Sequence, residues 1–134
     1  MYSFRKSKKG FTLIELMVVV AIIGVLALLG LRLYTGQQEK AKNAIVKANA
    51  GTVQTLIQAD FADNQDQTLL EAQAVGLTGG LHNPFTGAVM LAAEFSTASA
   101  GATVVTGANG GPFTIQGYGK VATTLVGEAL TAQK

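Results

Sequence analysis

An uninterrupted apolar segment near the N-terminus is the feature that most constrains this chain. Between Phe11 and Leu31 the only polar side chains are those of Thr12 and Glu15. As a helix, this segment would be about 30 Å long, which matches the hydrocarbon core of a bilayer. A chain of 134 residues is too short to bury a helix that is apolar on every side. The segment is therefore predicted to span a membrane.

The charges around this segment predict its orientation. The formal net charge is +2, but +4 of it precedes Gly10, so the remaining chain is acidic. The basic leader residues are Arg5, Lys6, Lys8 and Lys9. Positive charge beside an apolar span stays on the cytoplasmic side of the membrane. We therefore expect the leader, residues 1–10, in the cytoplasm, and we interpret the basicity as a topology signal rather than as nucleic-acid binding.

A cleaved secretory signal is the main alternative for the segment. Such a signal has a shorter apolar core, roughly 7–15 residues, followed by a small-x-small cleavage site. Here the apolar run is longer, and the residues that follow it, 32–36, offer no such pattern. The sequence therefore favours a retained membrane helix over residues 11–31.

Glu15 is hard to explain in a simple membrane anchor, because an unpaired carboxylate is costly inside the bilayer. The basic leader residues all precede the apolar segment, so the intact sequence suggests no nearby partner. A cut between Gly10 and Phe11 would create an α-amino group four residues before Glu15. This amine could pair with Glu15 within one chain or between neighbours, and pairing between neighbours would fix the register of an assembly.

The segment from Lys8 to Leu16, K-K-G-F-T-L-I-E-L, resembles the class III signal peptide of type IV pilins and pseudopilins. The resemblance implies cleavage after Gly10 and methylation of the Phe11 amine by a prepilin peptidase and N-methyltransferase. It further implies that an inner-membrane assembly platform extracts the subunits and packs them, helix against helix, into a homopolymer. In that polymer Glu15 would neutralise the N-terminus of an adjacent subunit. A glycine before the cut suits a narrow protease cleft.

The chain departs from the family pattern at Arg32, where many members carry a proline that loosens the helix. Arg32 cannot replace that proline, but its long side chain can reach the headgroups from the end of the apolar run. Gly24 and Gly30 could supply flexibility instead, since glycine costs about 0.5–1 kcal/mol relative to alanine inside a helix. We predict partial melting between Gly24 and Arg32 upon assembly.

The second part of the same helix, residues 32–62, is predicted to be amphipathic and to run to about Phe61. Small and apolar residues recur at intervals of three or four and are expected to face a globular head: Ala41, Ile45, Ala48, Thr52, Leu56 and Ala59. The opposite, solvated face is expected to hold Lys40, Asn43, Lys47, Gln54 and Gln58.

Residues 63–134 are expected to form a small globular head. Thr68 and Glu71 have the spacing of a capping box, which predicts a short helix over 69–75 with Gly76 as its stop. The segment Asn83–Gly87 has the composition of a tight turn. Four short strands are predicted: Ala88–Ala93, Thr103–Thr106, Phe113–Tyr118 and Lys120–Val126, with a hairpin connection at Gly107–Gly111. The expected fold class is α+β, the type IV pilin fold.

The residues that enzymes and metal sites need are sparse. The chain has no cysteine, and His82 is its only histidine. Asp60, Asp63 and Asp66 recur every third residue, whereas calcium loops place ligands at every second, so a solvated helix end is the preferred interpretation. We expect no enzymatic activity, cofactor, bound metal or nucleic-acid partner.

The resemblance favours a major pilin, stored as a single-pass protein of the inner membrane and assembled into a cell-surface or periplasmic filament. Adhesion, twitching motility and DNA uptake are the roles that such filaments serve. Three alternatives stay open at this point. The first is a pseudopilin of a type II secretion or competence system, the second is a minor pilin or tip binding module, and the third is an unrelated single-span anchor.

Overall fold

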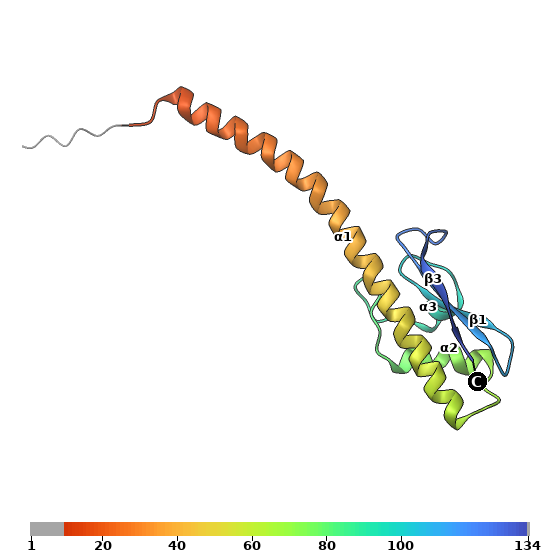
Figure 1. Ribbon diagram of the computed structural model, residues 1–134. Helices are drawn as coiled ribbons and strands as arrows, with labels where there is room; N and C mark the ends of the chain where they lie inside the picture. Colours follow the sequence, from red (N-terminus) through yellow and green to blue (C-terminus); the bar gives the residue numbers. More distant parts are fainter. Residues whose placement is uncertain (1–9, 134) are drawn as a thin grey trace, which may run out of the picture. The chain divides into compact units, whose positions relative to one another are not determined.

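The computed structural model describes residues 10–133 (Figure 1). Over this range the helices are α1 (Leu13–Asp63), α2 (Leu69–Thr78) and α3 (Ala92–Ser96). The strands are β1 (Thr103–Gly107), β2 (Phe113–Tyr118) and β3 (Leu125–Ala132). The chain divides into two compact units, with the boundary between Gln37 and Gln38. A long apolar helix continued beside a small antiparallel sheet is the α+β pilin architecture that the sequence predicts.

The helix α1 is continuous from Leu13 to Asp63, close to the predicted limits. It begins two residues later than expected because Thr12 precedes it as a cap rather than as its second residue. Within the second unit, its residues after Gln37 lie beside the sheet, as Figure 1 shows.

The core of the second unit lies between α1 and the sheet. Val46, Val53 and Ile57 of α1 are fully buried. At the end of the helix, the Phe61 ring stacks on Phe113 of β2, with 5.5 Å between the ring centroids. The other buried members come from every remaining element and the loops: Ala50, Ala72, Met90, Phe95, Val105, Ile115 and Ala132.

The predicted inward face of this half of α1 is wrong. Ala41, Ala48 and Ala59 are exposed, and 47% of Ile45 is exposed. The buried face is centred on Val46, Ile57 and their neighbours, which offer larger apolar side chains than the alanine and threonine series. Because burial free energy grows with apolar area, the larger side chains determine which face docks.

The sheet has the order β1-β2-β3, and both pairs are antiparallel. Phe113–Tyr118 forms β2 with the predicted bounds, and its alternating side chains Phe113 and Ile115 are fully buried. The predicted hairpin connection joins β1 to β2.

The strand expected over Lys120–Val126 is wrong, because most of that segment forms a turn. There the Gly119 N–H donates to the Thr124 carbonyl at 2.7 Å, and the Thr124 N–H donates to the Val121 carbonyl at 2.9 Å. β3 begins at the end of this turn, at Leu125.

The capping box before α2 is confirmed. The Thr68 N–H donates to the Glu71 carboxylate at 2.7 Å, and the Glu71 N–H donates to the Thr68 hydroxyl at 3.3 Å. The predicted stop at Gly76 is wrong, since α2 continues to Thr78. A glycine is needed at position 76 because Phe95 of α3 packs against its backbone. A β-carbon at this position would lie 2.6 Å from the Phe95 ring.

The strand expected over Ala88–Ala93 is also wrong. Only a single bridge joins Val89 to His82, and α3 occupies the end of that segment. The Glu94 carboxylate accepts a hydrogen bond from the Leu91 N–H at 2.9 Å, which favours a helical start there over a strand. The tight turn before it is confirmed: the Gly87 N–H donates to the Asn83 carbonyl at 2.8 Å, and Gly87 has a φ of 75°.

Candidate assembly site

The first unit is an apolar helix that the chain leaves uncovered. From Leu13 to Tyr34 every large apolar side chain is between 51% and 77% exposed. By length and composition, α1 is the one helix within residues 10–133 able to cross a membrane. A soluble protein gains nothing from exposing such a helix to water, so these side chains require a bilayer or other protein chains around them.

Glu15 is held by Thr12 in a reciprocal pair of hydrogen bonds. The Thr12 N–H donates to Glu15 Oε2 at 2.9 Å, and the Glu15 N–H donates to Thr12 Oγ1 at 3.3 Å. This is a capping box, which satisfies two of the backbone donors that the first turn of α1 leaves unpaired. Glu15 therefore has a hydrogen-bonding partner that the sequence analysis did not name, whereas its pairing with a positive charge stays a prediction.

The signal for this contact was present in the sequence. Thr12 and Glu15 have the same spacing as Thr68 and Glu71, for which the capping box was predicted. The box places one carboxylate oxygen, Oε2, against the Thr12 N–H. Within the described chain, Oε1 makes no hydrogen bond, so the carboxylate keeps acceptor capacity for another donor.

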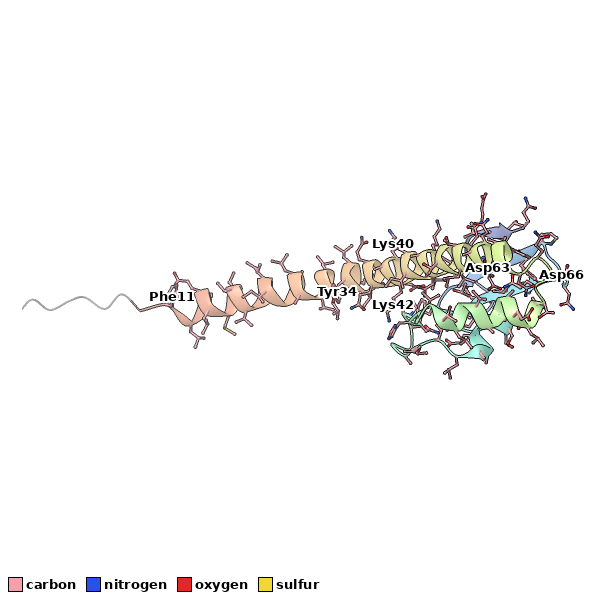
Figure 2. All side chains as sticks on the ribbon, turned by 90° about the horizontal axis from the view of Figure 1, so that it is seen from below. Phe11, Tyr34, Lys40, Lys42, Asp63 and Asp66 are labelled. Atoms are coloured by element: carbon pink, nitrogen blue, oxygen red, sulfur yellow. The ribbon has the colours of Figure 1, made fainter. Side chains whose placement is uncertain are left out.

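Apolar side chains surround this carboxylate. Phe11, Ile14, Val18 and Val19 line a shallow hollow together with Glu15. Phe11 is 91% exposed and precedes the helix, as Figure 2 shows. The hollow thus presents one anionic group within an apolar surface at the N-terminal end of α1.

The predicted cleavage position lies outside the helix. Gly10 is exposed, has no heavy atom within 4 Å of its would-be β-carbon, and belongs to no helix or strand, like Phe11 after it. A peptidase can reach such a bond without unfolding the helix. The basic leader residues Arg5 to Lys9 lie outside the described residues.

Gly24, Gly30 and Arg32 all lie inside the continuous helix and are exposed. No atom lies within 4 Å of a would-be β-carbon on either glycine, so neither is required for a close approach in the single chain. The predicted melting of this segment concerns the assembled state and stays a prediction.

The acidic residues at the end of α1 are spread over its last turn and the loop before α2. Within residues 10–133, no group of three or more His, Asp or Glu side chains is placed to hold a metal ion. The Asp60 carboxylate instead accepts a hydrogen bond from the Gln67 side-chain amide, which ties the end of α1 to the loop before α2.

Comparisons with known proteins agree with the geometry at the N-terminus. Residues 5–31 match the family model described as the prokaryotic N-terminal methylation motif. No solved structure matches the chain.

Several curated proteins are similar to the chain over part of its length. The fimbrial protein EcpB of Eikenella corrodens is 46% identical over 55 residues, 41% of this chain and 35% of that protein. The type IV major alpha-pilin of Moraxella bovis is 35% identical over 77 residues, 54% of this chain and 48% of that protein. The type IV major pilin protein PilA of Myxococcus xanthus is 38% identical over 60 residues, 45% of this chain and 27% of that protein. The chain thus spans about a quarter to a half of the length of these relatives.

The matched motif covers Gly10, Phe11, the capped Glu15 and the exposed apolar part of α1, so the similarity lies in the same region as the candidate site. Through this N-terminal region the chain is similar to type IV pilins and fimbrial proteins.

Proposed function

We propose that the chain is a structural, non-enzymatic subunit that polymerises through α1 into a type IV pilus filament. The observation that carries the proposal is the uncovered apolar helix with a single acid, Glu15, at its start. The fimbrial and major-pilin names of the relatives support a subunit of the filament shaft.

Before assembly, α1 holds the precursor in the inner membrane with the leader in the cytoplasm. The prepilin peptidase and N-methyltransferase cut after Gly10 and methylate the Phe11 amine, and the assembly platform then extracts the subunit. The exposed position of Gly10 outside the helix supports cleavage there. The filament is then displayed on the cell surface or in the periplasm.

Glu15 pairs with the methylated Phe11 amine of a neighbouring subunit. The Thr12 amide that caps Glu15 is retained after cleavage, so the capping box persists in the mature chain. The amine then approaches a carboxylate whose orientation is already fixed and whose Oε1 still accepts hydrogen bonds. In an apolar filament core the cost of leaving such a charge unpaired is large, which makes the pair a strict register signal.

The exposed face of the second half of α1 also contributes to helix packing. Its residues are small or apolar and uncharged: Ala41, Ala44, Ile45, Ala48, Gly51, Thr52 and Ala59. A helix face that stays in water is normally polar, whereas small side chains let two helices approach closely. The face that was expected to dock on the head is thus proposed to pack against α1 of another subunit.

The test compares Glu15→Gln and Glu15→Ala with Glu39→Gln, a matched control that removes an exposed acid from the same helix. Both Glu15 variants are expected to insert into the membrane and to lose surface filaments, measured by electron microscopy and by subunit recovery in sheared fractions. The control is expected to assemble as the parent chain does. Normal filaments from both Glu15 variants would contradict the proposal and favour a single-span anchor.

A further inference from the structure

We propose that the second unit, Gln38 onward, contacts a second copy of itself head to tail, through a basic end of one copy and an acidic end of the next. This contact rests on the proposed filament and adds to it a partner surface that is separate from the apolar helix and from Glu15.

The basic end gathers four lysines at the start of the unit: Lys40, Lys42, Lys47 and Lys120. The first three lie on α1. Lys120 is brought to them by the turn between β2 and β3, since a β-carbon on Gly119 would lie 3.4 Å from the Asn43 side chain. Glu39 and Glu128 are the acids of this end, so it keeps a positive balance.

The acidic end lies where α1 finishes and α2 begins. It holds Asp60, Asp63, Asp66 and Glu71, and the sequence has no lysine or arginine between Lys47 and Lys120. Figure 2 shows Lys40 and Lys42 at one end of this stretch of α1 and Asp63 and Asp66 at the other. The unit is therefore charged with opposite signs at its two ends.

The two ends are too far apart to neutralise each other within one chain. Lys40 and Asp60 are separated by 20 residues of continuous helix, about 30 Å at the rise of an α-helix. That separation is several Debye lengths at physiological ionic strength. Lys40 and Asp63 are both exposed.

Each end also exposes large apolar side chains beside its charges. At the basic end, Val121 is 56% and Leu125 is 59% exposed. At the acidic end, Leu70, next to Glu71, is 78% exposed. Apolar side chains beside charges are typical of specific protein interfaces, in which charge sets orientation and apolar contact adds affinity.

A second copy is the occupant that fits both ends. A head-to-tail contact uses two different patches of the same chain and leaves each free to repeat, so it builds an open filament rather than a closed dimer. The two copies would be offset along the helix axis by the separation of the ends, about 30 Å. An anionic lipid surface would use only the basic end and would leave the acidic end without a role.

Charge reversal with compensation tests the contact. The variants are Lys40→Glu, Asp63→Lys and the double variant that carries both. Each single variant is expected to lower the yield of sheared filaments about tenfold, which corresponds to a coupling between positions 40 and 63 of about 1.4 kcal/mol. The double variant is expected to recover most of that loss, because positions 40 and 63 again carry opposite charges.

A net-charge control is the double variant Lys40→Glu with Glu128→Lys. It has the same net charge as the compensating variant and restores the positive balance of the basic end, but it leaves like charges at positions 40 and 63, so its yield is expected to stay low. Thermal unfolding of each detergent-extracted subunit, followed by circular dichroism, is expected to match the parent chain because the substituted side chains are exposed.

Normal assembly of both single variants, or a double variant no better than the singles, would overturn the inference. So would a Lys40→Glu loss that Asp63→Lys cannot restore and that tracks weaker binding to phosphatidylglycerol vesicles, which would assign the basic end to lipid. These outcomes leave the proposed filament standing as long as the Glu15 variants fail to assemble. Assembly without Glu15 would remove the filament proposal itself.

Discussion

The two halves of α1 form one continuous helix, yet they differ in burial. Before Gln38 no described residue of the helix is buried, whereas after it Val46, Val53 and Ile57 are completely enclosed. The first half is the more apolar of the two, so apolarity alone does not decide burial. Burial depends on whether other parts of the chain pack against the helix. They pack against the second half, whereas the first half stays exposed.

The difference in burial indicates that the two halves of α1 specify two kinds of contact: contacts within the subunit and contacts with its surroundings. The second half encodes contacts within the subunit, and substitutions there should change its stability. Under the proposed function the first half encodes contacts with a membrane or with other copies, so substitutions there should change assembly and leave the fold of the second unit intact.

Truncating a core aromatic should have the largest effect on stability. Phe113→Ala removes a fully buried ring that stacks on Phe61, and it should lower the free energy of unfolding by about 3–5 kcal/mol. Val19→Ala, a truncation in the exposed first half, should leave that free energy unchanged. Thermal and urea unfolding of the extracted subunit measure both. A similar loss of unfolding free energy in the two variants would contradict the proposed difference between the halves of α1.

Adding a β-carbon where a glycine contacts an aromatic ring should have a smaller effect on stability. Gly76→Ala would place a β-carbon 2.6 Å from the Phe95 ring and should destabilise the second unit by about 1–3 kcal/mol. The matched control is Gly51→Ala, a helical glycine with open space around it, which should stabilise the helix by about 0.5–1 kcal/mol. Unfolding midpoints that shift in the same direction for both variants would contradict this placement of α2 on α3.

Removing the N-terminal cap of α2 should lower the free energy of unfolding by less than Gly76→Ala does. Thr68→Ala should lower stability by about 1 kcal/mol, because it removes the hydroxyl that accepts the Glu71 N–H. The backbone and side chain of Thr68 donate to the Glu71 carboxylate and lower its pKa below the usual value. The stabilisation that comes from the charged Glu71 carboxylate is therefore present at neutral pH and is lost as the pH falls through the lowered pKa of Glu71.

The pH dependence checks the same cap independently. Unfolding curves of the parent chain should lose stability on acidification, and the Glu71→Gln variant should lose less over the same range. An identical pH dependence in the two proteins would show that Glu71 contributes nothing through its charge.

A substitution on the exposed face of the second half should have the smallest effect on stability. Ala48→Lys should change the free energy of unfolding by less than about 0.5 kcal/mol, because the residue is exposed in the single subunit. If this face packs against another α1, the same variant should still reduce filament yield sharply. Gln58→Ala, on an exposed part of α1 outside that face, adds no charge to the acidic end, so it is the control and should assemble normally.

Local signals in the sequence predicted much of this structure. The leader motif, the membrane-length helix, the Thr68 capping box, the turn at Asn83–Gly87 and strand β2 each depend on neighbouring residues alone. The same rule applied at Thr12 would have found the partner of Glu15. These features could be predicted because capping, turn chemistry and alternation act over a few residues.

The errors all depend on contacts between distant residues. Gly76 has the composition of a helix stop, but it serves as the contact for Phe95, nineteen positions later. The face of α1 was misassigned because its alanines repeat as regularly as its larger residues, and only the sheet reveals which side is covered. The segment Ala88–Ala93 has strand-like residues, yet the local pairing of Glu94 favours α3.

The central claim is that the working form is a polymer whose subunits begin at a methylated Phe11. Intact-mass spectrometry of subunits dissociated from purified surface filaments tests it most directly. The account predicts the mass of a chain that starts at Phe11 and carries one added methyl group. Filament subunits that still begin at Met1 would contradict it, because no free amine would then be available to Glu15.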